Sequence, residues 1–424
     1  MKPIATLWGH FLNDSLFRNS IYLMLTTGVM GVFGFFFWLI CTHIFTPEEI
    51  GIGTTLISVL TFISFISLLG FNSTFIGLLP KSQNRNDEIN TGLILVISTA
   101  ILTAAVYIFL IPHLTPKLGM IYEKFWYPAV FILMAALISV NSLTDSIFIA
   151  YRSAHYNLLS DGFITSGTKL ILPIVFASIG AYGVFLASSL ATATGMLASI
   201  IFLFKKFDFK PKLVIDTGIL KKVFQYSFAN YTANLINIVP TFVLPIIIIN
   251  YLSAAAAAYY YLAFMLSNLL YTVSGSISQS LFAEGSHAEN TLRILIKRSL
   301  VTLTVLLIPA SIGLAILGPI VLNFFGKSYG AGGADVIFIL AITAPAVAAY
   351  NLGTVILRIR HQMYSLNVVS AVYAITISIL TLLWVNMGLT WIAIAWAIGN
   401  FFAATLAFLL IFLYRKYPTP VTIH

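Results

Sequence analysis

Long apolar runs separated by short polar segments dominate the chain. A hydrocarbon core about 30 Å thick needs roughly 20 apolar residues per helix. Twelve runs of this kind can be drawn between polar breaks, at residues 20–44, 51–79, 90–111, 125–151, 157–179, 182–204, 222–250, 254–282, 292–317, 335–357, 363–385 and 389–413. The pattern predicts an all-α polytopic membrane protein with twelve transmembrane helices.

Composition agrees with this prediction and excludes some chemistry. Hydrophobic residues make up 59% of the 424 positions and charged residues only 8%, which no soluble globular domain of this length shows. The single cysteine, Cys41, excludes an intrachain disulfide, and no Cys and His residues show metal-ligand spacing. We therefore expect no metal and no cofactor. The first apolar run has no small-residue cleavage site behind it, so we expect it to act as its own insertion signal.

The distribution of Lys and Arg predicts the orientation. With a cytoplasmic N-terminus, eighteen of the twenty-two Lys and Arg residues fall on the cytoplasmic side. The outer segments hold only Lys117, Lys124 and Lys327. Both termini should be cytoplasmic, in a multi-pass protein of the cell (cytoplasmic or inner) membrane. The net charge of +9 is then mostly an insertion signal at the inner leaflet and does not indicate nucleic-acid binding.

An internal repeat divides the predicted spans into two sets of six. The hairpin HIFTPEEIGIGTTLISVL at 43–60 has a counterpart about 207 residues later, NYLSAAAAAYYYLAFML at 250–266. Arg85 before the third span likewise matches Arg293 before the ninth. An even number of spans gives both halves the same orientation, which makes this a parallel repeat of the type that rocks around a midplane site. The predicted parts are a six-helix lobe at 1–204, a cytoplasmic linker at 205–221 and a second six-helix lobe at 222–424.

Several segments, in this order and spacing, resemble a known family. They are FTPEEIGIG after the first span, TDSIFIAYRSAHY at the end of the fourth, GAYGVFLA before the sixth and NFFGKSYG after the ninth. Together with the twelve spans they resemble the polysaccharide-transporter branch of the multidrug/oligosaccharidyl-lipid/polysaccharide (MOP) flippase superfamily, over essentially the whole chain.

The resemblance implies a fold and an activity. The fold would be a V-shaped, MATE-like pair of lobes with a central cavity lined mainly by the first, second, seventh and eighth helices. The activity would be transfer of a lipid-linked oligosaccharide, carried on a polyprenyl phosphate or pyrophosphate, from the cytoplasmic to the outer leaflet. The lipid bilayer and glycan-assembly enzymes are the other implied partners.

Polar side chains form a stripe on the seventh predicted span. Its members recur at intervals of four, four, three and four residues: Tyr226, Asn230, Asn234, Asn237 and Thr241. An amide without a partner in hydrocarbon costs several kcal/mol, so the stripe must face protein or water. Two interpretations stay open at this point: hydrogen bonds between helices, or the wall of a cavity.

Two other spans carry similar stripes. The eighth span has Asn268, Tyr271, Ser274 and Ser278, and the second has Thr54, Ser58 and Thr61. The second-span stripe is the weaker signal because Ser and Thr can bond to their own backbone. Amides, hydroxyls and tyrosine rings offer a sugar neutral hydrogen-bonding groups and flat apolar faces.

Charged residues interrupt the fourth and fifth spans. Asp145 lies on one helical face with Asn141, Ser142 and Arg152, and Asp161 is expected to be a helix-end carboxylate that the N-terminal dipole favours. Together with Lys169, the most deeply placed charge of the chain, Asp145 and Asp161 are the charged residues inside these spans.

Lys169 requires a receiving group inside the protein. It lies about 18 Å into its span and cannot snorkel to either surface, so an unpartnered ammonium would cost about 2.5–3.5 kcal/mol. Asp145 on the preceding helix is the first candidate for an ion pair, with Thr165 and water as alternatives. Lys169 then serves either to bind an anionic group, such as a lipid phosphate, or as half of a structural pair.

Arginines near cytoplasmic span ends are further candidates for a headgroup site. They are Arg18, Arg298, Arg358 and Arg360, each of which can equally be a topology determinant. The resemblance favours Arg18 most, because related lipid flippases place cations near the cytoplasmic end of the first helix.

Two other functions are alternatives to transport of a lipid-linked glycan. A cation-coupled multidrug exporter would need a carboxylate well inside the first or seventh span; none is there, and Asp145 and Asp161 are the only acids placed inside spans. A membrane-embedded glycan polymerase should carry acid or base residues on a sizeable loop, but the outer loops at 111–124 and 318–334 offer only Glu123. The chain is therefore not expected to be an enzyme.

Overall fold

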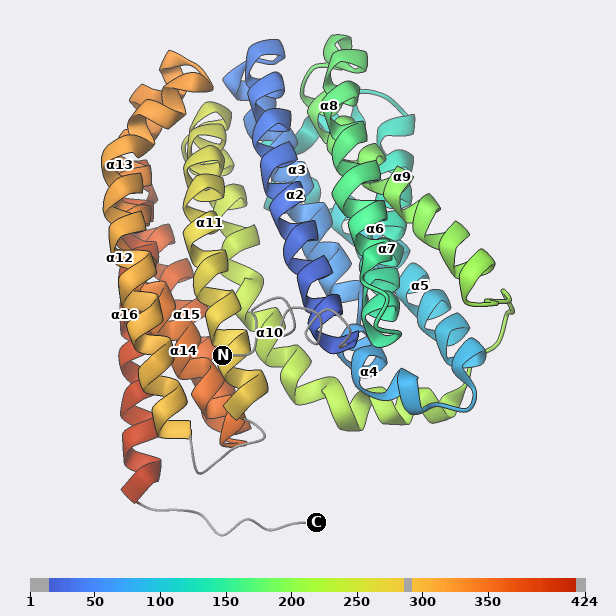
Figure 1. The fold of residues 1–424 in the computed structure, drawn as a ribbon. Coiled ribbons are helices and arrows are strands. Elements are labelled where there is room, and N and C mark those ends of the chain that lie inside the picture. Colours follow the sequence, from blue (N-terminus) through green and yellow to red (C-terminus); the bar gives the residue numbers. More distant parts are fainter. Residues whose placement is uncertain (1–14, 286–291, 417–424) are drawn as a thin grey trace, which may run out of the picture. The chain divides into compact units, whose positions relative to one another are not determined.

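The structure is a computed structural model that describes residues 15–285 and 292–416 (Figure 1). All regular elements in these ranges are helices, as the apolar pattern predicted. The chain divides into two compact units, Met1–Tyr231 and Thr232–His424. The division falls inside helix α10, ten residues beyond the predicted linker at 205–221, whose role as the boundary between repeated lobes stays a prediction.

The helices of each unit follow the predicted spans closely. The first unit contains α2 (Ser15–Ile44), α3 (Pro47–Ser67), α4 (Phe71–Leu78), η1 (Leu79–Lys81), α5 (Arg85–Leu114), η2 (Pro116–Tyr122), α6 (Trp126–Ala150), α7 (His155–Asn157), η3 (Leu158–Thr165), α8 (Ser166–Val175), η4 (Ala177–Ile179), α9 (Ala181–Lys206) and the beginning of α10 (Thr217–Tyr251). The second unit contains the rest of α10, then α11 (Ala254–Gly285), α12 (Leu292–Phe324), α13 (Lys327–Ile342), α14 (Ala344–Ile359), α15 (Met363–Trp384), η6 (Val385–Met387) and α16 (Leu389–Lys416).

The number of helices able to cross a membrane is close to the predicted twelve. Within the described ranges, ten helices are long and apolar enough, or eleven if the bent pair α13 and α14 is one span. Helix α11, which corresponds to the predicted eighth span, is 32 residues long but is not among these ten. Its second half is rich in Ser, Asn and Gln, which lowers its hydropathy. The count of twelve stays a prediction.

Three predicted spans have internal breaks. The second ends as α3 at Ser67, because Leu69 and Gly70 adopt positive φ angles of 50° and 88° before α4 begins. The tenth is divided into α13 and α14, which are bent by 43° where Pro345 lies at the start of α14 and cannot donate a helical hydrogen bond. The fifth contains a π-helical segment, η3, between α7 and α8.

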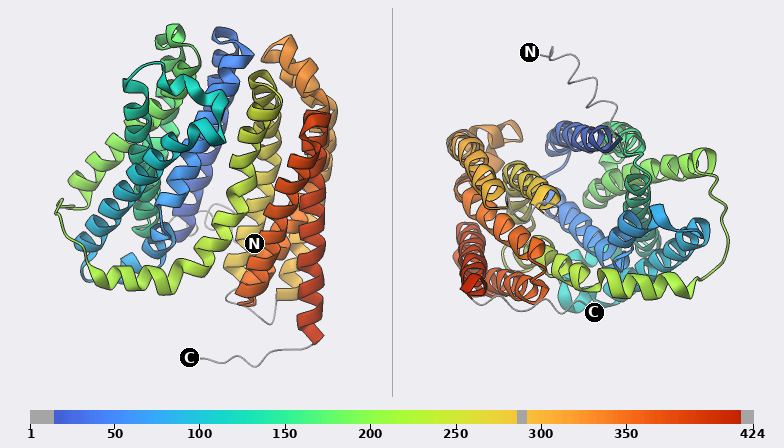
Figure 2. Two further views of the ribbon diagram at one scale, coloured as in Figure 1. Left: turned by 180° about the vertical axis from the view of Figure 1, so that it is seen from behind. Right: turned by 60° about the horizontal axis from the view of Figure 1, so that its bottom comes forward.

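Helices α3, α6 and α9 form the core of the first unit. In each of them, more than half of the residues in the most apolar stretch are buried. Close contact between these helices depends on small residues. A Cβ on Gly53 of α3 would come within 2.6 Å of the Val184 side chain in α9. Tyr182 of α9 stacks on Tyr127 of α6 with ring centroids 3.7 Å apart and donates a 2.7 Å hydrogen bond to its carbonyl oxygen. Helix α2 packs against α8 and η3 (Figure 2).

An aromatic cluster lies in the core of the second unit, where α11, α14 and α16 pack together. Trp396 of α16 makes edge contacts with Phe264 and Tyr373, whose ring centroids lie 5.0 and 6.0 Å from its own. Tyr350 of α14 stacks on Tyr373 at 4.7 Å. These large rings fix the spacing of four helices around the cavity described below.

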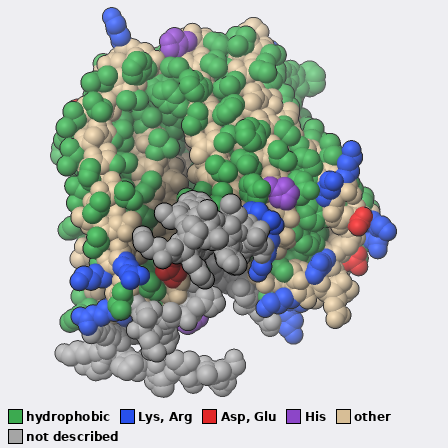
Figure 3. Space-filling model, in the orientation of Figure 1, with side chains coloured by type: hydrophobic (Ala, Val, Ile, Leu, Met, Phe, Trp, Pro, Cys, Tyr) green, Lys and Arg blue, Asp and Glu red, His purple; other side chains and the backbone are tan. Residues whose placement is uncertain are grey.

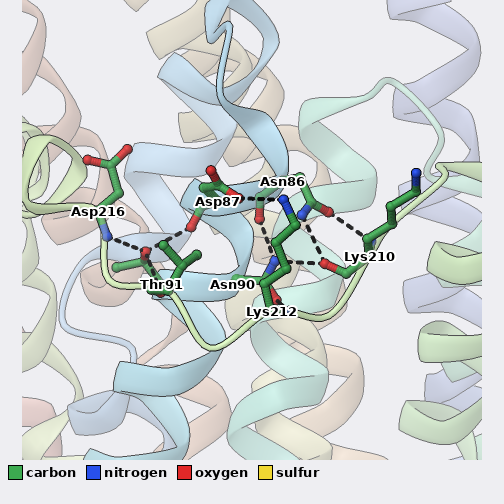
Figure 4. Close-up of polar contacts among 8 residues, drawn as sticks. Asn86, Asp87, Asn90, Thr91, Lys210, Lys212 and Asp216 are labelled. Carbon is green, nitrogen blue, oxygen red and sulfur yellow. Dashed lines mark hydrogen bonds and ion pairs between the residues drawn. The ribbon is translucent and has the colours of Figure 1, made fainter.

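The linker between α9 and α10 is fastened to the start of α5, within the first unit (Figure 4). Asn86 exchanges two hydrogen bonds with the backbone of Lys210, at 2.9 and 2.8 Å. Asn90 donates to the Lys210 carbonyl at 2.9 Å and accepts from the Lys212 amide at 3.0 Å. Thr91 accepts from the Asp216 amide at 2.8 Å. Side chains of α5 thus supply the hydrogen-bond partners that the backbone of the extended linker needs.

Two ion pairs reinforce this attachment. Lys212 lies 3.8 Å from Asp87 and Lys222 lies 2.8 Å from the buried Glu88. The hydrogen bond to Glu88 raises the pKa of Lys222. The linker was predicted to lie along the membrane surface; its attachment to α5 was not predicted.

Surface chemistry agrees with a protein surrounded by lipid. Hydrophobic side chains cover most of the visible face of each unit, and Lys and Arg gather toward one end (Figure 3). In the second unit these include the exposed Arg293, Lys297 and Arg298 at the start of α12. This is the end that the charge distribution predicts to be cytoplasmic.

Candidate functional site

A polar cavity of about 250 Å³ lies inside the second unit. It is an open cavity lined by α10, α11, α14, α15 and α16, and its wall is formed by Asn234, Asn237, Gly275, Ser278, Gln279, Val347, Tyr350, Asn351, Thr354, Val355, Arg358, Tyr373 and Asn400. Most of these residues carry amide, hydroxyl or guanidinium groups, although the helices that supply them are strongly apolar. Such a concentration of hydrogen-bonding groups inside a membrane span makes this cavity the candidate binding site.

Asn237 fulfils both interpretations of the seventh-span stripe. Its Nδ2 donates to Ser370 Oγ at 3.2 Å, and its Oδ1 accepts a hydrogen bond from the Tyr350 hydroxyl. It therefore joins α10 to α15 and α14, and at the same time forms part of the cavity wall. Asn234 also lines the cavity but is more exposed. The side chains of Tyr226 and Asn230 lie outside the part of the chain whose side chains the structure describes.

Arg358 is the cation of the cavity. Its Nη2 lies 3.4 Å from Asn234 Oδ1 and its guanidinium carbon lies 5.9 Å from the centre of the Phe282 ring. Its Nε is buried without a hydrogen-bond partner. No carboxylate among residues 15–285 and 292–416 forms an ion pair with Arg358. Its charge and a free donor are available to a ligand.

Other polar atoms of the wall also lack partners. Asn400 is only 1% exposed, and its Oδ1 has no hydrogen-bond partner in the described part of the chain. The same holds for the buried Ser278 Oγ. The cavity therefore offers both an uncompensated donor and free acceptors.

The eighth-span stripe is divided between packing and the cavity. Tyr271 is buried, donates a 2.7 Å hydrogen bond to the Leu340 carbonyl and stacks on Trp396, so it stabilises the fold and does not line the cavity. Asn268 is exposed and lies outside the wall. Ser274 accepts a 3.1 Å hydrogen bond from Asn351 and so helps to orient this residue of the cavity wall.

The hydroxyls of the second-span stripe bond to their own backbone, the possibility that made this stripe the weaker signal. Thr54, Ser58 and Thr61 donate to the carbonyls of Gly51, Thr54 and Ile57, at 3.1, 2.9 and 2.8 Å. Their hydrogen bonds stay within their own helix, and they provide no evident binding group.

Lys169 does not form the expected ion pair with Asp145. Its Nζ lies 5.9 Å from the centre of the Phe37 ring, and the ion pairs found in the described ranges do not include it. The backbone carbonyl of Asp145 instead accepts a 3.3 Å hydrogen bond from Asn157. Asn157 precedes Lys169 by twelve residues, which is about 18 Å along a helix. The height of Asp145 relative to the fifth span was therefore misjudged. A role of Lys169 in substrate binding stays a prediction.

Asp161 lies in the first turn of η3, near a helix start as expected, but it is buried. It is 6% exposed and belongs to the π-helical segment η3, where its Oδ1 accepts a 3.0 Å hydrogen bond from Asn141 of α6. Arg18 is exposed near the start of α2, and its charge acts on His155 at the start of α7. Its predicted contact with a headgroup stays a prediction.

Sequence reasoning missed several members of the cavity wall. Tyr350, Asn351 and Asn400 were not singled out, although two are asparagines inside apolar runs, the same signal that identified Asn237. Tyr373 gave no signal, since an isolated tyrosine in an apolar run is most often a packing residue.

The fold is that of MOP superfamily transporters. The structure superimposes on the lipid II flippase MurJ in an inward closed conformation with a TM-score of 0.72 and 13% identity, over 95% of this chain and 94% of that one. An inward-facing multidrug resistance MATE family transporter gives a TM-score of 0.71 with 14% identity, over 95% and 100%. A MOP superfamily transporter from Pyrococcus furiosus gives 0.67 with 15% identity, over 95% of each chain.

Sequence comparison adds the family. The model of a polysaccharide biosynthesis protein family matches residues 40–331, more than half of the chain. No curated protein sequence matches. The chain belongs to this polysaccharide biosynthesis family and is a multi-pass membrane protein with the MOP transporter fold, as the resemblance implied.

Proposed function

We propose that this protein moves a lipid-linked oligosaccharide across the cell membrane, from the cytoplasmic to the outer leaflet, by alternating access. The observation that carries the proposal is the cavity of the second unit, where a single uncompensated arginine, Arg358, adjoins a wall of neutral amides and hydroxyls. Membership of a polysaccharide biosynthesis family and the fold shared with a lipid II flippase support it.

The chemistry of the wall suits a glycan attached to a phosphate. Sugar hydroxyls need donors and acceptors in equal measure, and Asn234, Asn351 and Asn400 supply both. Tyr350 and Tyr373 add flat apolar surface. Arg358 supplies positive charge and a guanidinium fork that matches a phosphate. Lys169 is a second candidate for phosphate binding, in the first unit.

A cation-coupled drug exporter remains the alternative activity on this fold. The described wall contains no Asp or Glu, whereas a site for an organic cation would be expected to present negative charge. The composition of the cavity thus favours an anionic or neutral polar substrate.

The test uses purified protein reconstituted in vesicles with a fluorescent polyprenyl diphosphate disaccharide, and follows the appearance of the glycan on the far leaflet. Arg358→Gln should lower the rate about 10- to 150-fold, the equivalent of a lost charged hydrogen bond of about 1.5–3 kcal/mol. Arg358→Lys should retain part of the activity because the charge remains. The matched control is Arg293→Gln, which removes an exposed arginine at the start of α12 and should transport normally.

Two outcomes would contradict the proposal. Unchanged transport by a well-folded Arg358→Gln protein would separate the cavity from the substrate. Efflux of a cationic dye in the same vesicles, without any transfer of the glycolipid, would establish the exporter instead.

A further inference from the structure

An apolar groove of about 100 Å³ runs between α12 and α14 in the second unit. Four aliphatic residues of α12 form one side of it: Leu300, Leu303, Leu307 and Ile308. Four residues of α14 form the other side. Leu300 and Ile308 are 44% and 43% exposed, so the groove is open along its α12 edge. It shares no lining residue with the polar cavity, and the proposed transport mechanism does not use it.

Small side chains on α14 create the groove. Ala348 packs against Leu303 and Leu307, and the next residue of the wall is also an alanine. A side chain of a single carbon leaves unfilled the space that a longer one would occupy between the helices. The hydroxyl of the wall, on Thr304, already donates to the Leu300 carbonyl at 2.8 Å. The described wall therefore presents hydrocarbon without a free side-chain donor or acceptor, and an apolar occupant fits it.

The groove is nearly as long as one leaflet is deep. From Leu300 to Ile308 it extends about 12 Å along α12, at roughly 1.5 Å per residue, and one leaflet contributes about 15 Å of hydrocarbon. Because α14 packs antiparallel to α12, the deeper end of the groove lies at Pro345, next to the 43° bend between α13 and α14. These dimensions fit a single linear hydrocarbon chain that enters from one leaflet.

A lysine lies just outside the other end of the groove. Lys297 precedes Leu300 by three residues and Thr304 by seven, so all three share one face of α12. Lys297 is exposed and forms no ion pair with a carboxylate of the described residues. It belongs to the end of the unit where Lys and Arg gather (Figure 3), which the charge distribution predicts to be cytoplasmic. A phosphate attached to a chain in the groove would lie within reach of its ammonium group.

We infer that the groove between α12 and α14 holds one acyl chain of an anionic glycerophospholipid of the cytoplasmic leaflet, with the lipid phosphate at Lys297. The groove supplies the apolar contact, and the lysine selects a negatively charged headgroup. The tail of a polyprenyl carrier is longer than one leaflet is deep and would extend beyond the groove. The bound lipid is therefore a resident of the protein surface and is distinct from the transported one.

Lipid binding can be measured without transport. Delipidated protein in detergent would receive equal amounts of phosphatidylglycerol and phosphatidylcholine with identical acyl chains, and native mass spectrometry would count the retained lipids. The wild type should retain phosphatidylglycerol in preference. Lys297→Gln should lower this preference about fivefold, the contribution of roughly one lysine next to an anionic headgroup. Lys327→Gln, which changes an exposed lysine at the start of α13, should leave the preference unchanged.

A second variant tests the groove itself. Thr304→Phe places a ring in the groove from its exposed side and should reduce retention of both lipids, whereas Val305→Phe, at a 64% exposed position outside the groove, should not. Lys297→Gln changes only an exposed side chain, so that result does not depend on how α12 tolerates the ring.

The inference would be overturned by equal retention of the two phospholipids in the wild type, or by equal loss of preference in Lys297→Gln and Lys327→Gln. Equal lipid retention by Thr304→Phe and Val305→Phe would show that the chain lies elsewhere. Displacement of phosphatidylglycerol by an equimolar polyprenyl phosphate would assign the groove to the tail of a transported lipid and would likewise contradict the inference.

Discussion

The attachment of the linker to α5 can be tested by removing one side chain. Asn90 is 4% exposed and makes two hydrogen bonds to the linker backbone, to the Lys210 carbonyl at 2.9 Å and from the Lys212 amide at 3.0 Å. Asn90→Ala deletes both bonds. The linker is then expected to separate from α5 more often, while the helices on either side remain folded.

The size of the effect follows from the number of bonds lost. A net contribution of about 0.5–1.5 kcal/mol per hydrogen bond gives about 1–3 kcal/mol for the pair. When local opening is fast compared with cleavage, proteolysis follows the population of the open form, so the cleavage rate should rise roughly 5- to 150-fold. Trypsin would cut after Lys212, next to the fully exposed Leu213, since Pro211 blocks cleavage after Lys210.

The assay compares tryptic cleavage rates of purified protein, with mass spectrometry to identify the cut. Asn84→Ala is the matched control: this asparagine is exposed one residue before α5 and its side chain makes no capping bond. Equal cleavage rates after Lys212 in the two variants would refute the argument that side chains of α5 hold the linker.

Two further predictions concern the first unit. Gly53→Ala should destabilise the protein by about 1–3 kcal/mol through overpacking, since the new Cβ would lie 2.6 Å from the Val184 side chain. The control is Gly28→Ala in α2, where a Cβ would meet no neighbouring atom within 4 Å, and which should be neutral or slightly stabilising. Equal thermal unfolding temperatures for the two variants would disprove the close contact at Gly53. Glu88→Gln should remove the part of the pH dependence of protein stability that comes from Lys222. The hydrogen bond to Glu88 raises the pKa of Lys222 in the folded protein above its ordinary value of 10.5. The ion pair therefore stabilises the fold fully below pH 10.5, and this stabilisation is lost as the pH rises through the raised pKa. Parallel plots of unfolding free energy against pH for the wild type and Glu88→Gln above pH 10.5 would contradict this.

Hydrophobic periodicity predicted the helices well because membrane insertion is decided by local composition. It could not predict the breaks. The left-handed turn at Leu69 and Gly70 and the π turn in η3 change the backbone over a few residues without changing the apolar character of the segment. The bend at Thr343 had a visible cause in Pro345, and sequence reasoning overlooked it.

The same distinction applies to the candidate residues. Asn234 and Asn237 could be identified from spacing alone, since an amide in an apolar helix must meet protein or water. The partner of Lys169 could not be identified from spacing, because a contact between antiparallel helices depends on how far one helix is shifted along its axis relative to the other. That shift is set by the turn at 151–157 and by the extra residue that a π turn accommodates.

The groups left without partners decide what the cavity of the second unit can bind. The neutral part of its wall holds two free acceptors, Asn400 Oδ1 and Ser278 Oγ, which suit the hydroxyls of a sugar. In the cavity the Nε of Arg358 is free and no described carboxylate opposes it, so the site attracts an anion. The type of side chain gives the polarity of a site, but the hydrogen bonds already made determine its sign. Neutralising the free donor, as in Arg358→Gln, therefore tests the part of the site that selects an anionic group.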